Sequence, residues 1–315
     1  MKICIPDDAP AVLAHAKAWP VFRDRFQADY YDPLPGTPER LLDRIKDAEV
    51  VVNIRSSTYF TAEVFAACPS LRLLSIWGTG TDNVDLEAAR RHGVTVTNTP
   101  AVSAPSIAEH TLALMLAIAR RIPQLDAKTR AGEWARGGMV QLVGKTCGVI
   151  GTGAIGSRFA ALAAGIGMRV ITWSYRQKPE LPYPFVSVDQ LLAESDIVSL
   201  HLRLSPETKD FLSAEKLALM KPTAFLVNTA RGAIVNEAAL VDALRNHKIA
   251  GAGLDVFETE PLPGDNPLKT LDNVVLTPHC AGVTPEVLEA GLSLSLTNVE
   301  KWMAGTPQHV VVRGK

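Results

Sequence analysis

A glycine-rich turn between an apolar run and a helical pattern constrains the fold of this chain most. Gly151, Gly153 and Gly156 are spaced as G-x-G-x-x-G, with a predicted buried strand at residues 146–150 before them and a predicted helix at 154–167 after them. In that context the first glycine permits a tight turn, the second lets the backbone approach a diphosphate, and the third lets the helix pack on its strand. The start of the helix also presents free N–H groups to an anion. The motif therefore predicts a dinucleotide site rather than a turn without a ligand.

Short β-branched runs alternate with helical patterns along almost the whole chain, which is typical of parallel sheets covered by helices. The first series predicts helices at 38–46 and 61–67, and strands at residues 2–5, 49–54, 71–76 and 94–97. The second series predicts strands at residues 146–150, 169–173, 196–200, 223–228, 251–255 and 274–276. Six strands are enough for a complete dinucleotide fold. We expect an α/β protein: a doubly wound Rossmann dinucleotide-binding domain plus a smaller, flavodoxin-like parallel α/β substrate domain.

Two longer helical patterns bear on the domain organisation. Residues 103–122 form the first, in which Ser106 followed by Glu109 resembles a capping box, and we expect this helix to join the two domains. Residues 285–303 form the second, and no strand that could pair in the second sheet follows them. We expect this last helix to return to the first domain. A chain of 315 residues suits two domains, which implies a cleft.

Composition excludes several classes of function. With 47% hydrophobic residues, 21% charged residues and a net charge of -1, the chain lacks the basic excess that nucleic-acid binding needs. The most apolar helical stretch, residues 107–118, is too short to cross a bilayer and carries Glu109 and His110. The four cysteines form no CxxC pair, and the N-terminus lacks the pattern of a secretory signal. We therefore expect no metal site, no nucleic-acid or membrane partner, and a reducing cytoplasm.

Three segments that follow predicted strands carry side chains suited to one reaction. They contain Arg231, Glu260 and His279, at the sheet edge where ligands bind in open α/β folds. Hydride transfer at C2 of a 2-hydroxy acid needs a cation to hold the carboxylate and a base to take the hydroxyl proton. The planar guanidinium of Arg231 suits the first task, and His279 with Glu260 as its partner suits the second. Singly each can be a surface or structural residue, but together they indicate a catalytic site.

The end of the second strand of the dinucleotide domain bears on cofactor choice. An NAD-specific site has an acidic residue there for the ribose 2′-hydroxyl. Here the strand is followed by Ser174, Tyr175, Arg176, Gln177 and Lys178. Ser174 replaces the acid, and it can donate to a 2′-phosphate together with Arg176. We expect NADP(H) to be preferred and NAD(H) to be possible; the alternative is that these cations are solvated and both cofactors are used.

The motifs together resemble the D-isomer-specific 2-hydroxyacid dehydrogenase family, which includes glyoxylate and hydroxypyruvate reductases. The resemblance rests on segments 144–156, 228–232, 255–261 and 277–279, in the family's order and spacing. It implies that Arg231 anchors the substrate, that Glu260 and His279 form the acid/base pair, and that Asp255 lies near the nicotinamide carboxamide. It also implies a substrate domain at residues 1–99 and 287–315, a dinucleotide-binding domain at 100–286, and a homodimer.

The resemblance extends to a loop of the first domain, where backbone N–H groups are expected to hold the substrate carboxylate. The expected substrate contacts are Arg55, Trp77, Gly78, Thr79, Gly80 and Arg231. The expected cofactor contacts are Gly151, Gly153, Ala154, Ile155, Gly156, Ser174, Tyr175, Arg176, His201, Thr229, Asp255, His279 and Gly282. The alternative for the loop that contains Arg55 is a solvent-facing turn.

Two other functions stay open at this point. A non-catalytic dinucleotide sensor could share the fold, although a sensor gains nothing from keeping Arg231, Glu260 and His279 together. A phosphite-type dehydrogenase is also compatible, whereas formate is disfavoured because formate dehydrogenases carry glutamine where Glu260 stands. Phosphoglycerate is disfavoured because Ile76 and Trp77 stand where an arginine is common. We expect a small-molecule substrate: glyoxylate, hydroxypyruvate, or an aryl or alkyl pyruvate.

Overall fold

A computed structural model describes residues 1–13 and 16–314 and divides the chain into two compact units. The first unit comprises Met1–Ser103 and Val283–Lys315, and the second comprises Ala104–Gly282. Both boundaries lie four residues from the predicted ones. Each unit is built on its own six-stranded sheet.

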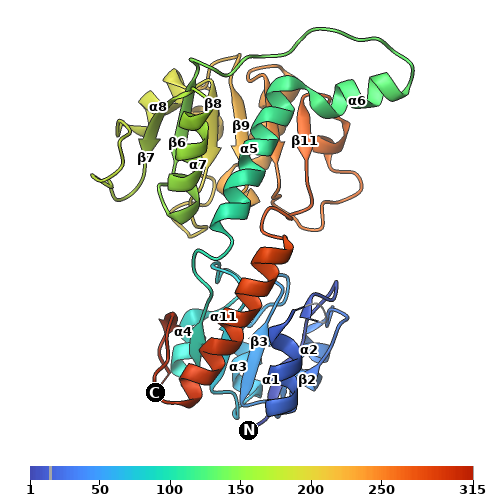
Figure 1. The fold of residues 1–315 in the computed structure, drawn as a ribbon, viewed down its shortest axis with the longest axis vertical. Coiled ribbons are helices and arrows are strands. Elements are labelled where there is room, and N and C mark those ends of the chain that lie inside the picture. Colours follow the sequence, from blue (N-terminus) through green and yellow to red (C-terminus); the bar gives the residue numbers. More distant parts are fainter. Residues whose placement is uncertain (14–15, 315) are drawn as a thin grey trace. The chain divides into compact units, whose positions relative to one another are not determined.

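The first unit has a sheet in the order β12-β5-β4-β3-β1-β2. Its strands are β1 (Ile3–Ile5), β2 (Asp29–Tyr30), β3 (Val50–Asn53), β4 (Leu73–Ile76), β5 (Thr95–Thr97) and β12 (Val310–Val312). Its helices, labelled in Figure 1, are α1 (Ala18–Phe26), α2 (Pro38–Ile45), α3 (Ala62–Ala67), α4 (Leu86–Arg91) and α11 (Pro285–Met303). Alternate residues of β3 point into two cores: Val51 joins α2, α3 and α4, while Val50 and Val52 join α1 and α11. This unit is therefore covered by helices on both faces.

Four elements of this unit do not follow from the sequence patterns. They are α1, the two-residue strand β2, α4 and β12. The sheet is not wholly parallel as predicted, because β12 pairs antiparallel with β5. The short final strand follows α11 and covers the edge of β5, where otherwise unpaired backbone groups would be exposed.

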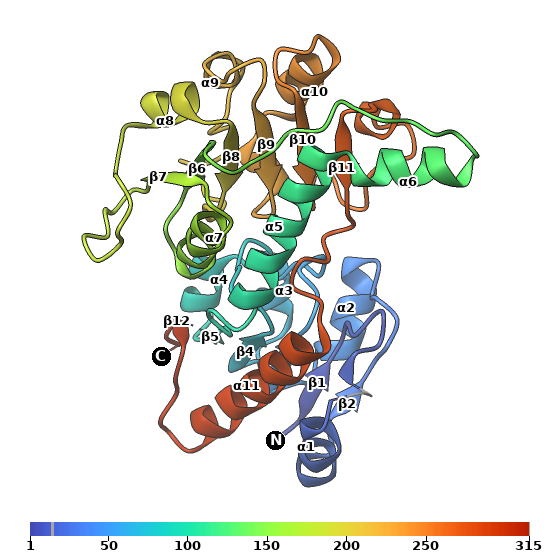
Figure 2. The ribbon, with the colours of Figure 1, turned by 45° about the horizontal axis from the view of Figure 1, so that its top comes forward.

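The second unit has an entirely parallel sheet in the order β11-β10-β9-β8-β6-β7 (Figure 2). Its strands are β6 (Thr146–Ile150), β7 (Arg169–Trp173), β8 (Ile197–Leu200), β9 (Phe225–Asn228), β10 (Gly251–Leu254) and β11 (Val274–Leu276). Its helices are α5 (Ala104–Arg120), α6 (Ile122–Arg130), α7 (Ala154–Gly165), α8 (Val188–Glu194), α9 (Ala214–Leu217) and α10 (Glu237–Arg245). Helices α5 and α7 cover one face, and α8, α9 and α10 cover the other. The predicted doubly wound fold is confirmed.

The long helix α5 differs from its prediction at both ends. It begins at Ala104, so Ser106 lies inside the helix and its hydroxyl donates to the Ala281 carbonyl at 2.7 Å. The predicted capping box is wrong, because Ser106 bonds to a distant loop instead of to the helix start. The helix ends at Arg120, since Arg121 adopts a left-handed conformation and a separate helix, α6, follows. Among the described residues, no helix is both long and apolar enough to cross a membrane.

Candidate active site

The glycine-rich turn lies between β6 and α7 and has room for a phosphate. Gly151 has a φ of +98°, and a Cβ atom there would lie 2.6 Å from the His201 carbonyl oxygen. A Cβ atom on Gly156 would lie 1.8 Å from the Gly151 oxygen, whereas one on Gly153 would meet nothing within 4 Å. No side chain caps the N-terminus of α7, so the predicted contacts Ala154 and Ile155 lie in a first turn whose N–H groups are available. The residues present fit a dinucleotide diphosphate.

The loop after β7 lies beside this turn, because Trp173 at the end of β7 pairs with Ile150 at the end of β6. Tyr175 packs edge-on against Trp173 at 5.0 Å between ring centroids, and its hydroxyl donates to the Glu207 carbonyl at 3.5 Å. Arg176 is exposed and forms no ion pair with any described residue. A cation in this position can interact with an anionic group on a bound ribose.

His201 follows β8 on the other side of the turn and packs against Gly151 and Gly156. Its Nε2 lies 2.9 Å from the Ser199 hydroxyl, and its ring packs 5.2 Å from that of Phe159. Burial lowers the pKa of His201 to about 3, so the imidazole is neutral at physiological pH. His201 can therefore support the glycine turn but does not supply positive charge to a phosphate.

His279 and Glu260 form a hydrogen-bonded pair. The Nδ1 atom of His279 lies 2.7 Å from Oε2 of Glu260, and each side chain is about one third exposed. The other carboxylate oxygen of Glu260 accepts from the Phe257 N–H at 3.0 Å. Burial opposes ionisation of Glu260, but the hydrogen bond and the charge of His279 outweigh it, so the pKa of Glu260 lies below its usual range. This leaves Nε2 of His279 as the ring atom that can exchange a proton with a substrate.

Asp255, fully buried after β10, holds the segment that carries His279. Its carboxylate accepts from the Thr277 hydroxyl at 2.6 Å and from the N–H groups of Cys280 and Ala281 at 3.0 and 2.9 Å. Its backbone carbonyl accepts from the N–H of His279 at 2.7 Å. Residue 279 has a φ of 50°, in the left-handed region. These bonds hold the histidine in an otherwise unfavourable backbone conformation.

His110 of α5 also contacts Asp255, and no motif in the sequence predicts this contact. Its Nε2 lies 3.5 Å from the Asp255 carboxylate and 3.0 Å from the Thr277 hydroxyl. Burial would raise the pKa of Asp255, but the hydrogen bonds from His110 and Thr277 lower it overall. Side-chain atoms of His110, Asp255 and Cys280 lie within 4.8 Å of one another, in a spacing that a metal ion could occupy. Because the carboxylate already accepts several hydrogen bonds, we interpret this group as a fixed hydrogen-bond network.

Arg231 follows β9, and the shape of its loop depends on the next residue. A Cβ atom on Gly232 would lie 1.9 Å from the carbonyl carbon of Phe257, so only glycine lets the two loops touch. This contact brings the loop of Arg231 against the loop of Glu260. The charge of Arg231 is also among the causes that lower the pKa of Glu260. Thr229, two residues earlier, is buried and lies 2.8 Å from the Thr111 hydroxyl.

In the first unit, the loop after β4 presents two backbone donors. Gly78 has a φ of +133°, and its own N–H donates to the Thr99 hydroxyl at 2.7 Å. The N–H groups of Thr79 and Gly80 donate to no described residue. Of the predicted carboxylate loop, these two amides are therefore the ones available to an anion.

Trp77 precedes this loop and packs within its own unit. A Cβ atom on Gly291 of α11 would lie 2.1 Å from the indole nitrogen of Trp77, so the ring occupies the space that a side chain would fill. The N–H of Trp77 donates to the Asn53 carbonyl at 2.8 Å. Trp77, which is a predicted substrate contact, thus also has a packing role. Nothing in the sequence around Gly291 indicates this contact.

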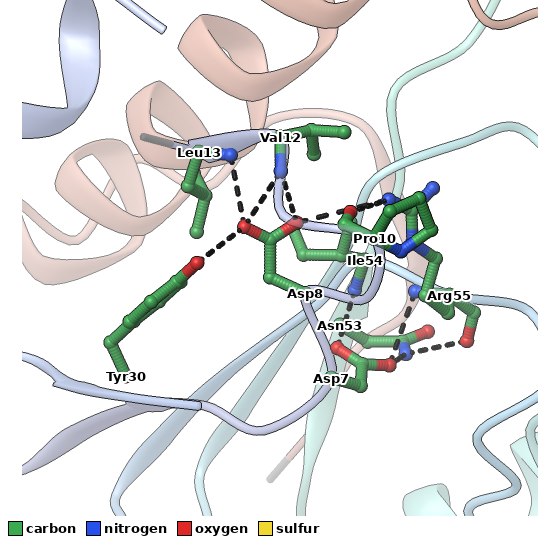
Figure 3. Close-up of polar contacts among 9 residues, drawn as sticks. All are labelled: Asp7, Asp8, Pro10, Val12, Leu13, Tyr30, Asn53, Ile54 and Arg55. Atoms are coloured by element: carbon green, nitrogen blue, oxygen red, sulfur yellow. Dashed lines mark hydrogen bonds and ion pairs between the residues drawn. The ribbon is translucent and has the colours of Figure 1, made fainter. Parts of the chain in front are cut away.

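Arg55 lies after β3 in a network of buried polar groups (Figure 3). The Asp7 carboxylate accepts from the backbone N–H groups of Ile54 and Arg55 at 2.9 and 3.1 Å and from the Asn53 amide. The Asn53 oxygen in turn accepts from the Asn83 amide at 3.0 Å. The loops after β1, β3 and β4 are therefore tied together at one edge of the sheet.

One of the two units carries a glycine-rich turn that is open at Gly153, followed by an arginine, a glutamate and a histidine after neighbouring strands. This combination defines a dinucleotide-dependent oxidoreductase. A family model described as D-isomer specific 2-hydroxyacid dehydrogenase, NAD binding domain, matches residues 112–281. The chain belongs to this family, and it is an NAD(P)-dependent 2-hydroxyacid dehydrogenase.

Individual relatives agree with this assignment. A glyoxylate reductase from Korarchaeum cryptofilum is 42% identical over 274 residues, which cover 84% of this chain and 82% of the relative. A D-3-phosphoglycerate dehydrogenase from Methanocaldococcus jannaschii is 41% identical over 280 residues and 85% of this chain, but the match spans only 52% of that relative.

Two similar solved structures contain different cofactors. An acyclic imino acid reductase in complex with NADPH and D-Arg has a TM-score of 0.90 at 30% identity, over 99% of this chain and 100% of its own. A D-lactate dehydrogenase from Aquifex aeolicus, complexed with NAD and lactic acid, has a TM-score of 0.88 at 29% identity over 100% of both chains. The family therefore fixes the reaction class and leaves the choice between NAD and NADP to local residues.

Proposed function

We propose that this protein is an NADPH-preferring reductase of glyoxylate or of a similarly small 2-keto acid. The observation that carries the proposal is the 2.7 Å hydrogen bond between His279 and Glu260 in a unit that also presents Arg231 and a glycine-rich turn open at Gly153. The glyoxylate reductases among its relatives support the choice of substrate.

Each side chain has a defined task in this proposal. When bound, the nicotinamide cofactor supplies the hydride. In the first unit, the Thr79 and Gly80 amides are available to the substrate carboxylate. In the second unit, Arg231 supplies the cation that polarises the C2 oxygen. His279 holds a proton at Nε2 and donates it to that oxygen, while Glu260 stabilises the imidazolium. The first unit then serves as the substrate domain and the second as the dinucleotide-binding domain.

The NADPH preference is supported by the loop after β7. Ser174 stands where an acidic residue would repel a 2′-phosphate, and Arg176 is exposed without an ion-pair partner among the described residues. The absence of a fixed negative charge and the presence of a guanidinium both favour binding of a 2′-phosphate over a 2′-hydroxyl at this position.

We also propose that the protein is a homodimer formed through the second unit. No residue of α6 is buried, and Trp134 in the segment after it is 78% exposed. The backbone N–H groups of residues 134–139 donate to no described residue. An exposed tryptophan on an unpaired segment is typical of a surface that a partner covers. The four free cysteines support the expected cytoplasmic location.

The test is a steady-state assay of NADPH and NADH with glyoxylate, hydroxypyruvate, phenylpyruvate and 3-phosphohydroxypyruvate. We expect the highest kcat/KM with NADPH and glyoxylate or hydroxypyruvate. Preference for 3-phosphohydroxypyruvate would contradict the proposed substrate. Tight NADPH binding without turnover of any keto acid would instead support a dinucleotide sensor.

A further inference from the structure

A buried carboxylate in the first unit has no task in the proposed reaction. Asp8 follows β1 and is fully buried. Its oxygens accept from the N–H groups of Val12 and Leu13, at 3.0 and 2.9 Å, and from the Tyr30 hydroxyl at 2.9 Å (Figure 3). These hydrogen bonds hold the carboxylate in one position. Asp8 therefore places an acidic group at a fixed point inside the substrate unit.

Arg55 is the cation that faces this charge. Its Nη2 lies 3.9 Å from Oδ1 of Asp8, and its side chain is only 15% exposed. The same nitrogen donates to the Pro10 carbonyl. Asp8 alone balances the charge of the guanidinium, and Asp7 adds further negative charge whenever it is ionised. The positive charge of Arg55 is therefore offset by a neighbouring carboxylate, while its Nε atom is buried without a hydrogen-bond partner among the described residues.

The loop that carries Arg55 lies beside the loop that we propose holds the substrate carboxylate. Asn53 at the end of β3 pairs with Ile76 at the end of β4, so Arg55 and Gly78 each lie two residues beyond neighbouring strand ends. The guanidinium itself reaches the loop after β1, on the other side of β3. A substrate held by the Thr79 and Gly80 amides would therefore bring a second anionic group to the Asp8–Arg55 pair by extending across the end of β3.

We propose that Asp8 is a specificity-determining residue that restricts this enzyme to 2-keto acids with a single negative charge. By balancing Arg55, it removes the attraction that an unpaired guanidinium would have for a second carboxylate or a phosphate ester. The inference rests on the proposed function, because it requires that the loops after β3 and β4 hold the substrate.

A purely structural role for Asp8 makes a different prediction, and two control variants separate the roles. Tyr30→Phe removes one hydrogen bond to Asp8 and leaves its charge in place. Asp43→Asn removes one negative charge from the exposed face of α2 in the same unit. Neither control should alter discrimination between singly and doubly charged substrates. If Asp8 only stabilises its turn, Asp8→Asn should lower the melting temperature without changing that discrimination.

The experiment measures kcat/KM for glyoxylate and for 3-phosphohydroxypyruvate and oxaloacetate in the complete protein with NADPH. Asp8→Asn is expected to raise the ratio of doubly to singly charged substrate about tenfold, which is of the order produced by one charge at close range in a partly exposed site. Arg55→Gln, which leaves Asp8 unbalanced, should lower the ratio, and the double variant should return it toward the original value. If Asp8→Asn fails to fold, Arg55→Gln alone still tests the proposal, because an unchanged ratio in that variant would overturn it.

The outcomes separate this inference from the proposed function. If Arg55→Gln raises KM for glyoxylate but the ratio is unchanged in Asp8→Asn and in the double variant, the specificity role of Asp8 is wrong and the substrate site stands. If Arg55→Gln and Gly80→Pro both leave KM for glyoxylate unchanged, the loops do not hold the substrate and both proposals fall. An equal change of the ratio in Tyr30→Phe would also overturn the inference, because charge would not be its cause.

Discussion

Replacing Glu260 by glutamine tests the central pair of the proposed mechanism. The variant keeps an oxygen that can accept from the Phe257 N–H, but it loses the negative charge 2.7 Å from Nδ1 of His279. Two charges about 4 Å apart interact by about 4 kcal/mol at an effective dielectric constant of about 20. Because both side chains are about one third exposed, solvent screening reduces this to at most about 1 kcal/mol.

That energy corresponds to at most about 0.7 pH unit. Reduction needs a proton donated from Nε2 of His279, and the carboxylate of Glu260 stabilises the imidazolium that donates it. Without that carboxylate, the upper pH limit of kcat/KM should move lower by about half a unit. The assay is kcat/KM against pH for glyoxylate with saturating NADPH.

The same loop offers a matched control at Glu258. Glu258→Gln removes the same charge from an exposed side chain two residues away, and it should leave the upper limit in place. If Glu260→Gln also leaves it in place, the hydrogen bond does not couple the two groups. If both variants shift it equally, the effect comes from the general charge of the loop and the pairing argument fails.

Three further changes test the remaining assignments. His279→Ala should lower kcat by ~10² to 10⁴-fold while the dissociation constant for NADPH, measured by calorimetry, stays within about threefold; unchanged turnover would remove His279 from the mechanism. Arg231→Lys should lose most of kcat/KM because a point charge does not reproduce a bidentate fork, and near-normal kcat/KM would mean that Arg231 is misassigned as the anchor. Ser174→Asp should lower kcat/KM for NADPH about tenfold or more relative to NADH; an unchanged ratio would place the 2′-phosphate elsewhere.

The fold could be predicted wherever periodicity and turn chemistry agree. Strands β6, β7 and β11 and helix α11 have the predicted bounds, because each is a regular apolar run or helical pattern limited by turn residues. The break between α5 and α6 was missed, since it depends on the left-handed backbone of Arg121, for which arginine carries no local signal. Strands β2 and β12 were missed because two or three residues are too few for a period to show.

The site was predictable at the level of residue type and strand end. Glu260 and His279 were expected to pair, and the structure places them 2.7 Å apart. The contact of His110 with Asp255 and the packing of Trp77 on Gly291 were not expected, because they join segments more than 100 residues apart. Only the packing of helices on the sheets brings such side chains together. Local sequence patterns do not show which distant segments will meet in this way.

Two buried aspartates at the ends of strands respond to acid in opposite directions. Hydrogen bonds lower the pKa of Asp255 overall, so its contribution to stability is present at neutral pH and is lost only as pH falls through that lowered value. Burial raises the pKa of Asp7, despite the hydrogen bonds from Ile54 and Arg55. The folded state therefore binds a proton at Asp7 at a pH where the unfolded chain does not, and this group favours folding more as the pH falls from 7 toward about 4.

Asp7→Asn tests this sign. The variant cannot titrate at position 7. As the pH is lowered, the unfolding free energy of the original protein should therefore rise relative to that of the variant. The slope should reach at most about 1.4 kcal/mol per pH unit, the value for one bound proton. The first unit can be followed separately through hydrogen exchange of the amides of β3, in both proteins between pH 7 and 4. Asp43→Asn provides the control, because its exposed carboxylate should leave the pH dependence of β3 unchanged. A difference between the original protein and Asp7→Asn that stays constant with pH, or that moves in favour of the variant in acid, would show that burial does not govern the ionisation of Asp7.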